Sequence, residues 1–151
     1  MQDAADWLKL DVQLCFRLYA ASRSMTRCYQ PLLAELGLTY PQYLAMLVLW
    51  EEDSLTVKRI GERLQLDSGT LTPLLKRMEQ AGLLQRQRRI ENEREVRVCL
   101  TDAGKALKEK AVAVPQALFT TLNLTLEEIS QLSHLLDKLL HNTAQTAAGS
   151  E

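Results

Sequence analysis

The sequence LTVKRIGERLQLDSGTLTPLLKRMEQAGLLQRQRRIENEREVRVCLT, residues 55–101, opens with two segments of helical periodicity. The first segment is short and places Ile60 and Leu64 on one apolar side. The second is expected over about 68–80, and residues 66–69 form a tight turn between the two. This stretch is therefore predicted to begin with two helices joined by a tight turn.

Two extended runs follow, over about 84–89 and 95–100, and the polar residues 90–94 separate them. Runs of this length around a short polar stretch are typical of a β-hairpin, here with a charged tip. Two helices, a turn and then a hairpin make a winged helix-turn-helix, which we predict for residues 55–101. In that motif the second helix fits the major groove of DNA, and a basic wing reaches the phosphates or the adjacent minor groove.

Hydroxyl and basic side chains gather on the second helix and on the hairpin. Short hydroxyls at a helix start can meet phosphates or base edges, and an arginine at the tip of the hairpin can enter the minor groove. The residues predicted to contact DNA are Ser68, Thr70, Thr72, Lys76, Arg77, Arg86, Arg88 and, at the tip, Arg94. Alternatively, Ser68 only caps the helix and the arginines only solvate the hairpin. The order and length of the segments favour DNA binding.

Charge is distributed unevenly along the chain. Residues 58–97 contain ten Lys and Arg against six Asp and Glu, a net charge of +4. The remainder carries eight against thirteen, so the whole chain has a net charge of −1. A locally basic surface attracts phosphate while the molecule stays soluble. An ordinary solvated surface could show the same asymmetry, so the charge supports DNA binding only together with the motif.

Length and composition are those of a soluble globular protein with one domain, residues 1–151. No stretch approaches the roughly 20 apolar residues of a membrane span and no signal peptide opens the chain, so a cytoplasmic protein is expected. Cys15, Cys28 and Cys99 are widely spaced and form no CxxC motif. We therefore expect free thiols, with no disulfide framework, metal site or cofactor.

Outside the winged motif the chain is predicted to be helical. The expected helices cover about 5–22, 25–36, 40–51, 102–114, 116–124 and 126–141. Thr39 with Gln42, and Thr125 with Glu128, are capping-box pairs that start two of these helices. Pro115 is expected to stop the helix before it, and the small polar residues 143–151 are expected to fray.

Several motifs together resemble the MarR family of dimeric transcription regulators, and in detail its organic hydroperoxide-sensing branch. The matching stretches are LCFRLYA at 14–20, TYPQYL at 39–44, LDSGTLTPLLKR at 66–77, LKRMEQAGLL at 75–84 and VCLTDAG at 98–104. The resemblance runs to about residue 140, and the stretch around the predicted turn, DSGTLTP, is its most specific part.

This resemblance implies a mainly α-helical homodimer with a small β-wing. The terminal regions, residues 1–36 and 102–142, would interlock the two copies as dimerisation helices. The two winged motifs would then read a pseudo-palindromic DNA operator, with reading helices about 34 Å apart. Repression is the usual direction of regulation in the family.

The resemblance also assigns a redox sensor. In the hydroperoxide-sensing branch a cysteine at the position of Cys15 is oxidised, which releases DNA. Tyrosines of the partner subunit, at the positions of Tyr29 and Tyr40, hydrogen-bond this thiol, and Tyr19 matches a third tyrosine near the site. A thiolate attacks the O–O bond, and phenols can stabilise that anion without carrying charge. Taken alone, Cys15 on an apolar stripe is better explained as a small core residue, and each tyrosine by ordinary packing; only together do they indicate a site.

Some relatives use a second cysteine in the region that corresponds to residues 117–127, and this chain has none there. We therefore expect the one-cysteine mode, in which a small cellular thiol forms a mixed disulfide or further oxidation follows. Cys28 could act as a resolving thiol, although packing explains it as well, and Cys99 is expected in the strand core. Asn92 stands where relatives carry an acidic residue that orients the tip arginine, which weakens the case for Arg94.

Three other functions remain open at the level of sequence. The chain could be a MarR-type regulator that responds to a small aromatic ligand at the dimer interface. A thiol peroxidase would need a resolving partner and turnover, and the large DNA-binding part argues against an enzyme. A protein-interaction module could use the winged motif without DNA, which the salt dependence of DNA binding would reveal.

Overall fold

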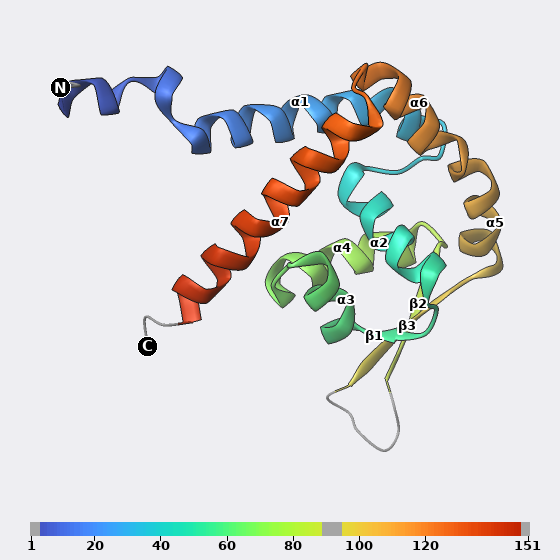
Figure 1. Cartoon of the computed structure of the whole chain (residues 1–151). Coiled ribbons are helices and arrows are strands. Elements are labelled where there is room, and N and C mark those ends of the chain that lie inside the picture. The colour runs from blue at the N-terminus through green and yellow to red at the C-terminus, as the bar shows by residue number, and fades with distance from the viewer. Residues whose placement is uncertain (1–3, 89–94, 149–151) are drawn as a thin grey trace. The chain divides into compact units, whose positions relative to one another are not determined.

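The structure is a computed structural model that describes residues 4–88 and 95–148 (Figure 1). Contacts divide the chain into two compact units, Met1–Pro115 and Gln116–Glu151. The elements are the 3₁₀ turns Ala4–Leu8 and Leu10–Val12, then α1 (Leu14–Ala34), α2 (Tyr40–Glu51), β1 (Leu55–Thr56), α3 (Val57–Leu64), α4 (Ser68–Gln80), β2 (Leu84–Arg88), β3 (Val96–Leu100), α5 (Asp102–Ala111), α6 (Ala113–Leu122) and α7 (Leu126–Ala148).

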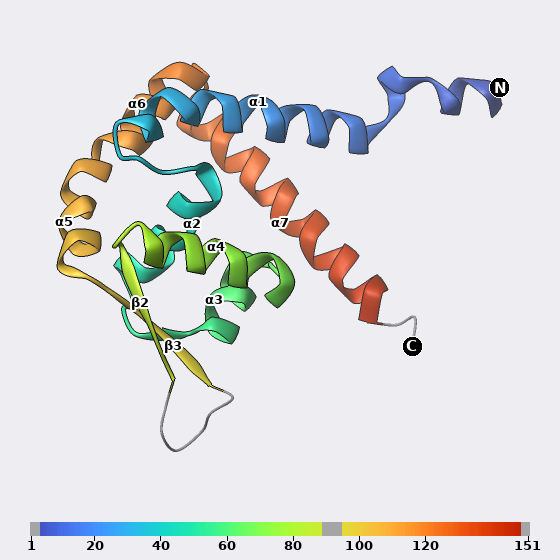
Figure 2. The same cartoon turned by 180° about the vertical axis from the view of Figure 1, so that it is seen from behind.

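The three strands form one antiparallel sheet with the order β1-β3-β2. In the hairpin Leu84 lies opposite Leu100 and Arg88 lies opposite Val96, which confirms the predicted wing. The third strand, β1, is only two residues long and places Leu55 beside β3. Seen from behind in Figure 2, β2 and β3 extend away from α3 and α4. We call residues 55–100, which contain α3, α4 and the sheet, the reading head.

One apolar core holds the reading head on α2. Tyr43, Ile60, Leu71, Leu75 and Met78 are each at most 2% exposed and belong to this core. Burying a side chain of this size contributes about 1.5–3 kcal/mol. Because α4 packs on α2, α3 and β2 together, its apolar side is held and its polar side is left outward.

Both predicted capping boxes are present. The Thr39 hydroxyl accepts from the backbone N–H of Gln42 at 3.4 Å, and the Gln42 side chain accepts from the Thr39 N–H at 2.9 Å. At the start of α7 the carboxylate of Glu128 accepts from the Thr125 N–H at 2.8 Å, and the Thr125 hydroxyl accepts from the Glu128 N–H at 3.2 Å. These contacts satisfy N–H groups that a helix start leaves without partners.

The prediction of two helices over 5–22 and 25–36 is wrong. Residues 14–34 form one α-helix, α1, and the residues before it form 3₁₀ turns. The polar residues between the two predicted helices include no glycine or proline, and the Thr26 hydroxyl donates to the Ser22 carbonyl at 2.9 Å within the helix. A hydroxyl that bonds back four residues is accommodated in a helix rather than ending it.

Two further helix ends differ from expectation. The break lies at Val112, and Pro115 stands in the first turn of α6 instead of stopping α5. A proline is tolerated there because N–H groups in the first turn have no partner inside the helix. The last helix continues to Ala148, beyond the predicted end at 141, because no proline or glycine interrupts it before residue 149.

The described ranges 4–88 and 95–148 contain neither a membrane-spanning helix nor a cluster of metal ligands. None of their helices combines the length and apolarity that crossing a membrane requires. No three His, Cys, Asp or Glu side chains in these ranges gather as metal ligands would.

Candidate DNA-reading surface and thiol site

The helix α4 separates its residues cleanly into two sides. Leu71, Leu74, Leu75 and Met78 are buried. The five residues of α4 that were predicted to contact DNA are all exposed, and they are Ser68, Thr70, Thr72, Lys76 and Arg77. Residues three and four apart share a helix face. Ser68, Thr72 and Lys76 therefore share one face of α4, whereas Thr70 and Arg77 lie further around its exposed side.

Asp67, and not Ser68, is the N-cap of α4. The Asp67 carboxylate accepts from the Thr70 N–H at 2.9 Å and from the Thr70 hydroxyl at 3.1 Å. These hydrogen bonds from Thr70 hold the pKa of Asp67 below its usual value. The interpretation of Ser68 as the cap is thus wrong. In this arrangement the Thr70 hydroxyl uses its O–H as the donor of the hydrogen bond to Asp67 and has only acceptor capacity left for DNA.

Arg86 is engaged inside the reading head. Its Nε and Nη2 lie 2.9 Å from Glu79 Oε2, and its backbone N–H donates to Glu79 Oε1 at 2.8 Å. The hydrogen bonds from Arg86 lower the pKa of Glu79. The pair connects the end of α4 to β2 and compensates the Arg86 charge, so a DNA contact by Arg86 stays a prediction. Arg88 is exposed on β2, and Arg94 lies outside the described residues.

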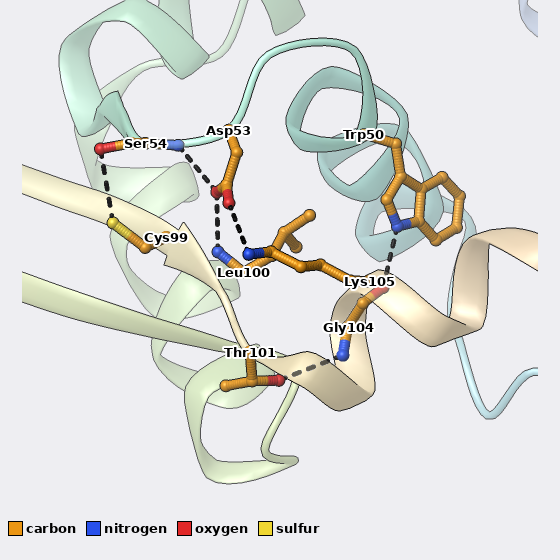
Figure 3. A network of polar contacts seen from close by, with 8 residues as sticks. All are labelled: Trp50, Asp53, Ser54, Cys99, Leu100, Thr101, Gly104 and Lys105. Atoms are coloured by element: carbon orange, nitrogen blue, oxygen red, sulfur yellow. Dashed lines mark hydrogen bonds and ion pairs between the residues drawn. The ribbon is translucent and has the colours of Figure 1, made fainter.

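The base of the wing is held by a loop that sequence reasoning did not single out (Figure 3). Asp53 Oδ1 accepts from the backbone N–H of Ser54 at 2.7 Å and from that of Leu100 at 2.8 Å. Cys99 Sγ lies 3.5 Å from Ser54 Oγ and is half-buried. Arg97 donates to the Ser54 carbonyl. The only signal in the sequence is an Asp-Ser pair before the first strand, which also fits an ordinary turn.

Cys15 is the second residue of α1, and it is exposed. Tyr19, one turn later on the same helix, is also exposed, and its phenol oxygen accepts from Arg23 at 3.2 Å. The Arg23 guanidinium lies 5.3 Å from the centre of the Tyr19 ring. The structure therefore places Cys15 and Tyr19 on an open part of α1.

The other predicted tyrosines gather elsewhere. The ring centres of Tyr29 and Tyr40 are 4.7 Å apart, and Tyr43, which sequence reasoning missed, lies 5.7 Å from Tyr29. Burial, together with Tyr40 and Tyr43, raises the pKa of Tyr29 to about 12. Tyr29 is therefore neutral at pH 7 and can only act there as an uncharged hydrogen-bonding group.

Within one chain Cys15 does not reach this tyrosine cluster. Tyr29 comes fourteen residues after Cys15 on the same helix, so the two are about 21 Å apart along the axis. Cys28 is displaced from Cys15 by about 20 Å in the same way. A disulfide needs Cα atoms within about 7 Å. Resolution of Cys15 by Cys28 of the same chain is therefore incompatible with an intact α1.

Comparison with known proteins gives the family. Residues 27–111 match the family described as transcriptional regulator SarA/Rot. A mutant of MarR from E. coli in complex with operator DNA superposes with a TM-score of 0.78 at 27% identity, over 85% of this chain and 94% of that one. The chain is also 53% identical to the organic hydroperoxide resistance transcriptional regulator of Bacillus subtilis (strain 168), over 96% of its own length and 99% of the relative. The chain belongs to the MarR family of transcriptional regulators.

A second MarR-type structure is equally similar. Reduced AbfR bound to DNA, a protein known from Staphylococcus epidermidis, matches with a TM-score of 0.79 and 36% identity, over 94% of this chain and 97% of that one. AbfR in a disulfide form matches with a TM-score of 0.61 and 35% identity, over 95% and 96%. The winged-helix fold and the resemblance to the hydroperoxide-sensing branch of the MarR family are thus confirmed. The relatives are transcription regulators and not enzymes, as expected.

Proposed function

We propose that this MarR-family protein is a homodimeric DNA-binding regulator that loses affinity for its operator when an organic hydroperoxide oxidises Cys15. The observation that carries the proposal is the separation of Cys15 from Tyr29 and Tyr40 within one chain. A thiol and phenols about 21 Å apart form one site only if a second copy of the chain supplies the phenols.

The reading head supports the DNA-binding part. Its outward side carries hydroxyl groups at the start of α4 and the basic residues Lys76 and Arg77 one to two turns later. Arg88 adds a positive charge on the exposed side of the wing. Helix-start N–H groups and basic side chains are the groups that bind phosphates and base edges in the major groove. In the related MarR and AbfR structures the partner is DNA.

The geometry of α1 restricts how two copies can meet. If Cys15 of each chain lies beside Tyr29 of the partner subunit, the two α1 helices must run antiparallel. The two-fold axis then passes near Ser22, which stands midway between residues 15 and 29. Ser22 also lies within about 20° of Cys15 around the helix, and it is exposed. The thiol, the helix midpoint and the phenol thus share one side of α1.

Apolar side chains before and at the start of α1 support a covered surface there. Leu8, Leu10 and Leu14 are 87%, 57% and 59% exposed, and Val12 and Phe16 are exposed as well. Several large apolar side chains left exposed along one short segment favour an interaction site there. A second copy that covers it would also surround the Cys15 thiol with apolar groups and favour organic hydroperoxides.

The oxidation step consumes only the Cys15 thiolate and the peroxide, and the later mixed disulfide also needs a small thiol. The thiolate attacks the terminal peroxide oxygen, the O–O bond breaks, Cys15 becomes a sulfenic acid, and the alkoxide takes a proton to leave as an alcohol. A small cellular thiol then condenses with the sulfenic acid, which forms a mixed disulfide and releases water. Because Tyr29 stays protonated at neutral pH, its O–H can stabilise the attacking thiolate.

The test uses duplex DNA that the reduced protein itself selects from a random-sequence pool. We expect cumene hydroperoxide with a small thiol to weaken binding of that duplex by about tenfold or more, which requires only about 1.4 kcal/mol. The Cys15→Ser variant should bind the duplex as tightly as the native protein and remain bound at the same peroxide dose. Intact mass identifies the oxidised species in both proteins.

Cys28→Ser is the matched control, because it removes a thiol from the same helix without touching Cys15. It should respond to peroxide as the native protein does. Release of Cys15→Ser from DNA at the native dose would refute the sensor assignment. Release by an aromatic acid with Cys15 still reduced would instead favour regulation by a small aromatic ligand. Absence of any selected duplex would refute DNA binding itself.

A further inference from the structure

Four aromatic side chains form a continuous column between α1 and the end of α2. The ring centres are 4.7 Å apart for Tyr40 and Tyr29, 5.7 Å for Tyr29 and Tyr43, and 6.4 Å for Tyr43 and Trp50. The last pair meets edge to face. We call these four side chains the aromatic column. The proposed sensing chemistry uses only its first two members, so Tyr43 and Trp50 need another explanation.

The far end of the column is fastened to α5 (Figure 3). Trp50 Nε1 donates to the Gly104 carbonyl at 2.9 Å. The Trp50 carbonyl in turn accepts from Lys108 Nζ at 3.0 Å. Trp50 is thus tied through both its side chain and its backbone to the first two turns of α5, and a displaced indole must either lose its partner or move Gly104.

Gly104 stands directly against the junction of α4 and the wing. A Cβ atom added to Gly104 would lie 2.1 Å from the Leu83 carbonyl oxygen, so the two backbones are in close contact. Next to it, the Thr101 N–H donates to the Leu83 carbonyl at 3.1 Å, and the Thr101 hydroxyl donates to the Gly82 carbonyl at 2.6 Å. Gly82 and Leu83 connect α4 to β2, so this contact touches both DNA-reading elements.

We infer that Tyr43 and Trp50 are positioning residues that transmit displacement of Tyr29 and Tyr40 through Gly104 to the junction of α4 and β2. This inference rests on the proposed function, in which oxidation of Cys15 in the partner subunit disturbs those two phenols. Close-packed interiors do not absorb a shift gradually, and they pass it between discrete arrangements. Each contact from Tyr40 through Trp50 and Gly104 to Leu83 is at packing or hydrogen-bond distance, so displacement of one group pushes on the next.

A positioning role of Tyr43 and Trp50 affects the coupling between oxidation of Cys15 and DNA affinity, and it need not affect stability. Coupling between two sites in one protein typically changes affinity by about 5–150-fold. We would measure the DNA affinity of the reduced and of the Cys15-oxidised protein, and take their ratio. The oxidised fraction is matched between proteins by intact mass, with cumene hydroperoxide and a small thiol as reagents and the self-selected duplex as probe.

Trp50→Phe removes the N–H donor to Gly104 and keeps an aromatic ring in the column. We expect this variant to bind DNA when reduced and to oxidise at Cys15, but to show a ratio reduced to about threefold or less, below the usual coupling range. Leu49→Val is the matched control, because it weakens packing at the neighbouring buried position of α2 outside the column. It should keep the native ratio.

The outcomes separate the two ideas. If the native protein does not oxidise at Cys15 or does not release DNA, the proposed function fails. If the native protein releases DNA and Trp50→Phe releases it to the same extent at equal oxidation, only the present inference fails. An equal loss of coupling in Leu49→Val would also overturn it, because a general loss of packing would then explain the effect.

A second measurement follows Trp50 directly in the protein with its native sequence. The chain contains two tryptophans, so protein grown with 5-fluorotryptophan gives two ¹⁹F signals, and Trp50→Phe identifies the Trp50 signal by its absence. We expect oxidation of Cys15 to shift the Trp50 signal of the full-length protein. An unchanged Trp50 signal in fully oxidised protein that has released DNA would overturn the inference.

Discussion

Gly104 illustrates a residue whose type is dictated by a neighbouring backbone. Any Cβ at this position would lie 2.1 Å from the Leu83 carbonyl oxygen and 3.2 Å from a methyl group of Leu100. The first of these distances is far shorter than van der Waals contact, and the atom it meets belongs to the backbone. Glycine is therefore what allows α5 to begin against the reading head.

Replacing Gly104 with alanine should destabilise the fold. We expect the unfolding free energy to fall by about 1–3 kcal/mol or more, because an extra atom is forced into a filled site. Urea unfolding measures this loss. Ala103→Ser, at the exposed neighbouring position, is the control and should be nearly neutral. Equal stability of Gly104→Ala and the native protein would mean that α5 does not approach Leu83 so closely.

The raised pKa of Tyr29 predicts a dependence of stability on alkaline pH. An exposed tyrosine has a pKa of about 10, whereas burial raises the pKa of Tyr29 to about 12 in the fold. Between these values the unfolded chain has released a proton that the folded chain still holds. The contribution is therefore complete below about pH 10 and is lost as the pH rises toward about 12.

Tyr29→Phe should accordingly make the alkaline loss of unfolding free energy less steep, and urea unfolding at a series of pH values measures it. Some slope remains, because burial also raises the pKa of Tyr43. Phe16→Leu changes an exposed aromatic residue on the same helix without removing an ionisable group, so it is the control and should leave the slope as it is. An unchanged slope in Tyr29→Phe would contradict the assigned environment of this phenol.

At the scale of elements, α4 and the wing are joined before they meet DNA. Glu79 at the end of α4 holds Arg86 of β2 through three contacts of 2.8–2.9 Å, while Asp53 accepts from the Leu100 N–H of β3. Each strand of the hairpin is therefore held by a carboxylate, β2 by Glu79 and β3 by Asp53. Exposed basic side chains such as Arg88 and Lys76 are not used in these contacts and are available to bind phosphates.

Two arginines on the same strand should consequently affect DNA binding in different ways. Each phosphate contact contributes about 0.9 to the slope of log affinity against log salt concentration. Arg88→Ala should lower the slope by about 1.8 in the proposed homodimer, because each of the two subunits loses one contact, and it should leave stability unchanged. Arg86→Ala should leave the slope nearly unchanged and lower stability, since Glu79 loses its partner. Affinity measured over a salt series distinguishes them, and the reverse pattern would show that Arg86 is the phosphate contact.

At the scale of the whole molecule, the residues of the proposed sensor do not come together within one chain. Cys15 is exposed near the start of α1, and the tyrosine cluster lies at the other end of the same helix. In the proposed dimer, two antiparallel α1 helices would bring the thiol of each chain to the phenols of the other. Dimerisation would therefore complete the site as well as set the spacing of two reading heads.

This arrangement predicts a specific cross-link. With the three natural cysteines replaced by serine, Ser22→Cys should form an interchain cross-link with a short bifunctional thiol reagent, seen as a dimer on a denaturing gel. Ser24→Cys is the control, since it lies only two residues away but about 160° further around the helix from Ser22, and it should react far less. Preferential cross-linking through position 24 would exclude the proposed pairing of α1.

Local sequence signals determined most of the fold of this protein. The capping pairs at Thr39 and Thr125, the helical periodicity of residues 68–80 and the hairpin flanking the charged tip all act within a few residues, so they can be recognised without the rest of the chain. The same holds for the outward position of Ser68, Thr72 and Lys76, because the buried side of a helix follows from its apolar spacing. The continuity of α1 was missed because hydroxyl residues can either end a helix or bond within it.

The tertiary structure decided which side chains meet across the chain. The pairing of Arg86 with Glu79, the contact of Trp50 with Gly104 and the tilted ring contact of Tyr43 with Tyr29 join separate elements. No local pattern encodes such contacts, since they depend on how the elements pack. The same reason explains why the residues of the proposed sensor lie apart: the single helix α1 separates Cys15 from Tyr29, so a second chain would have to supply the phenols.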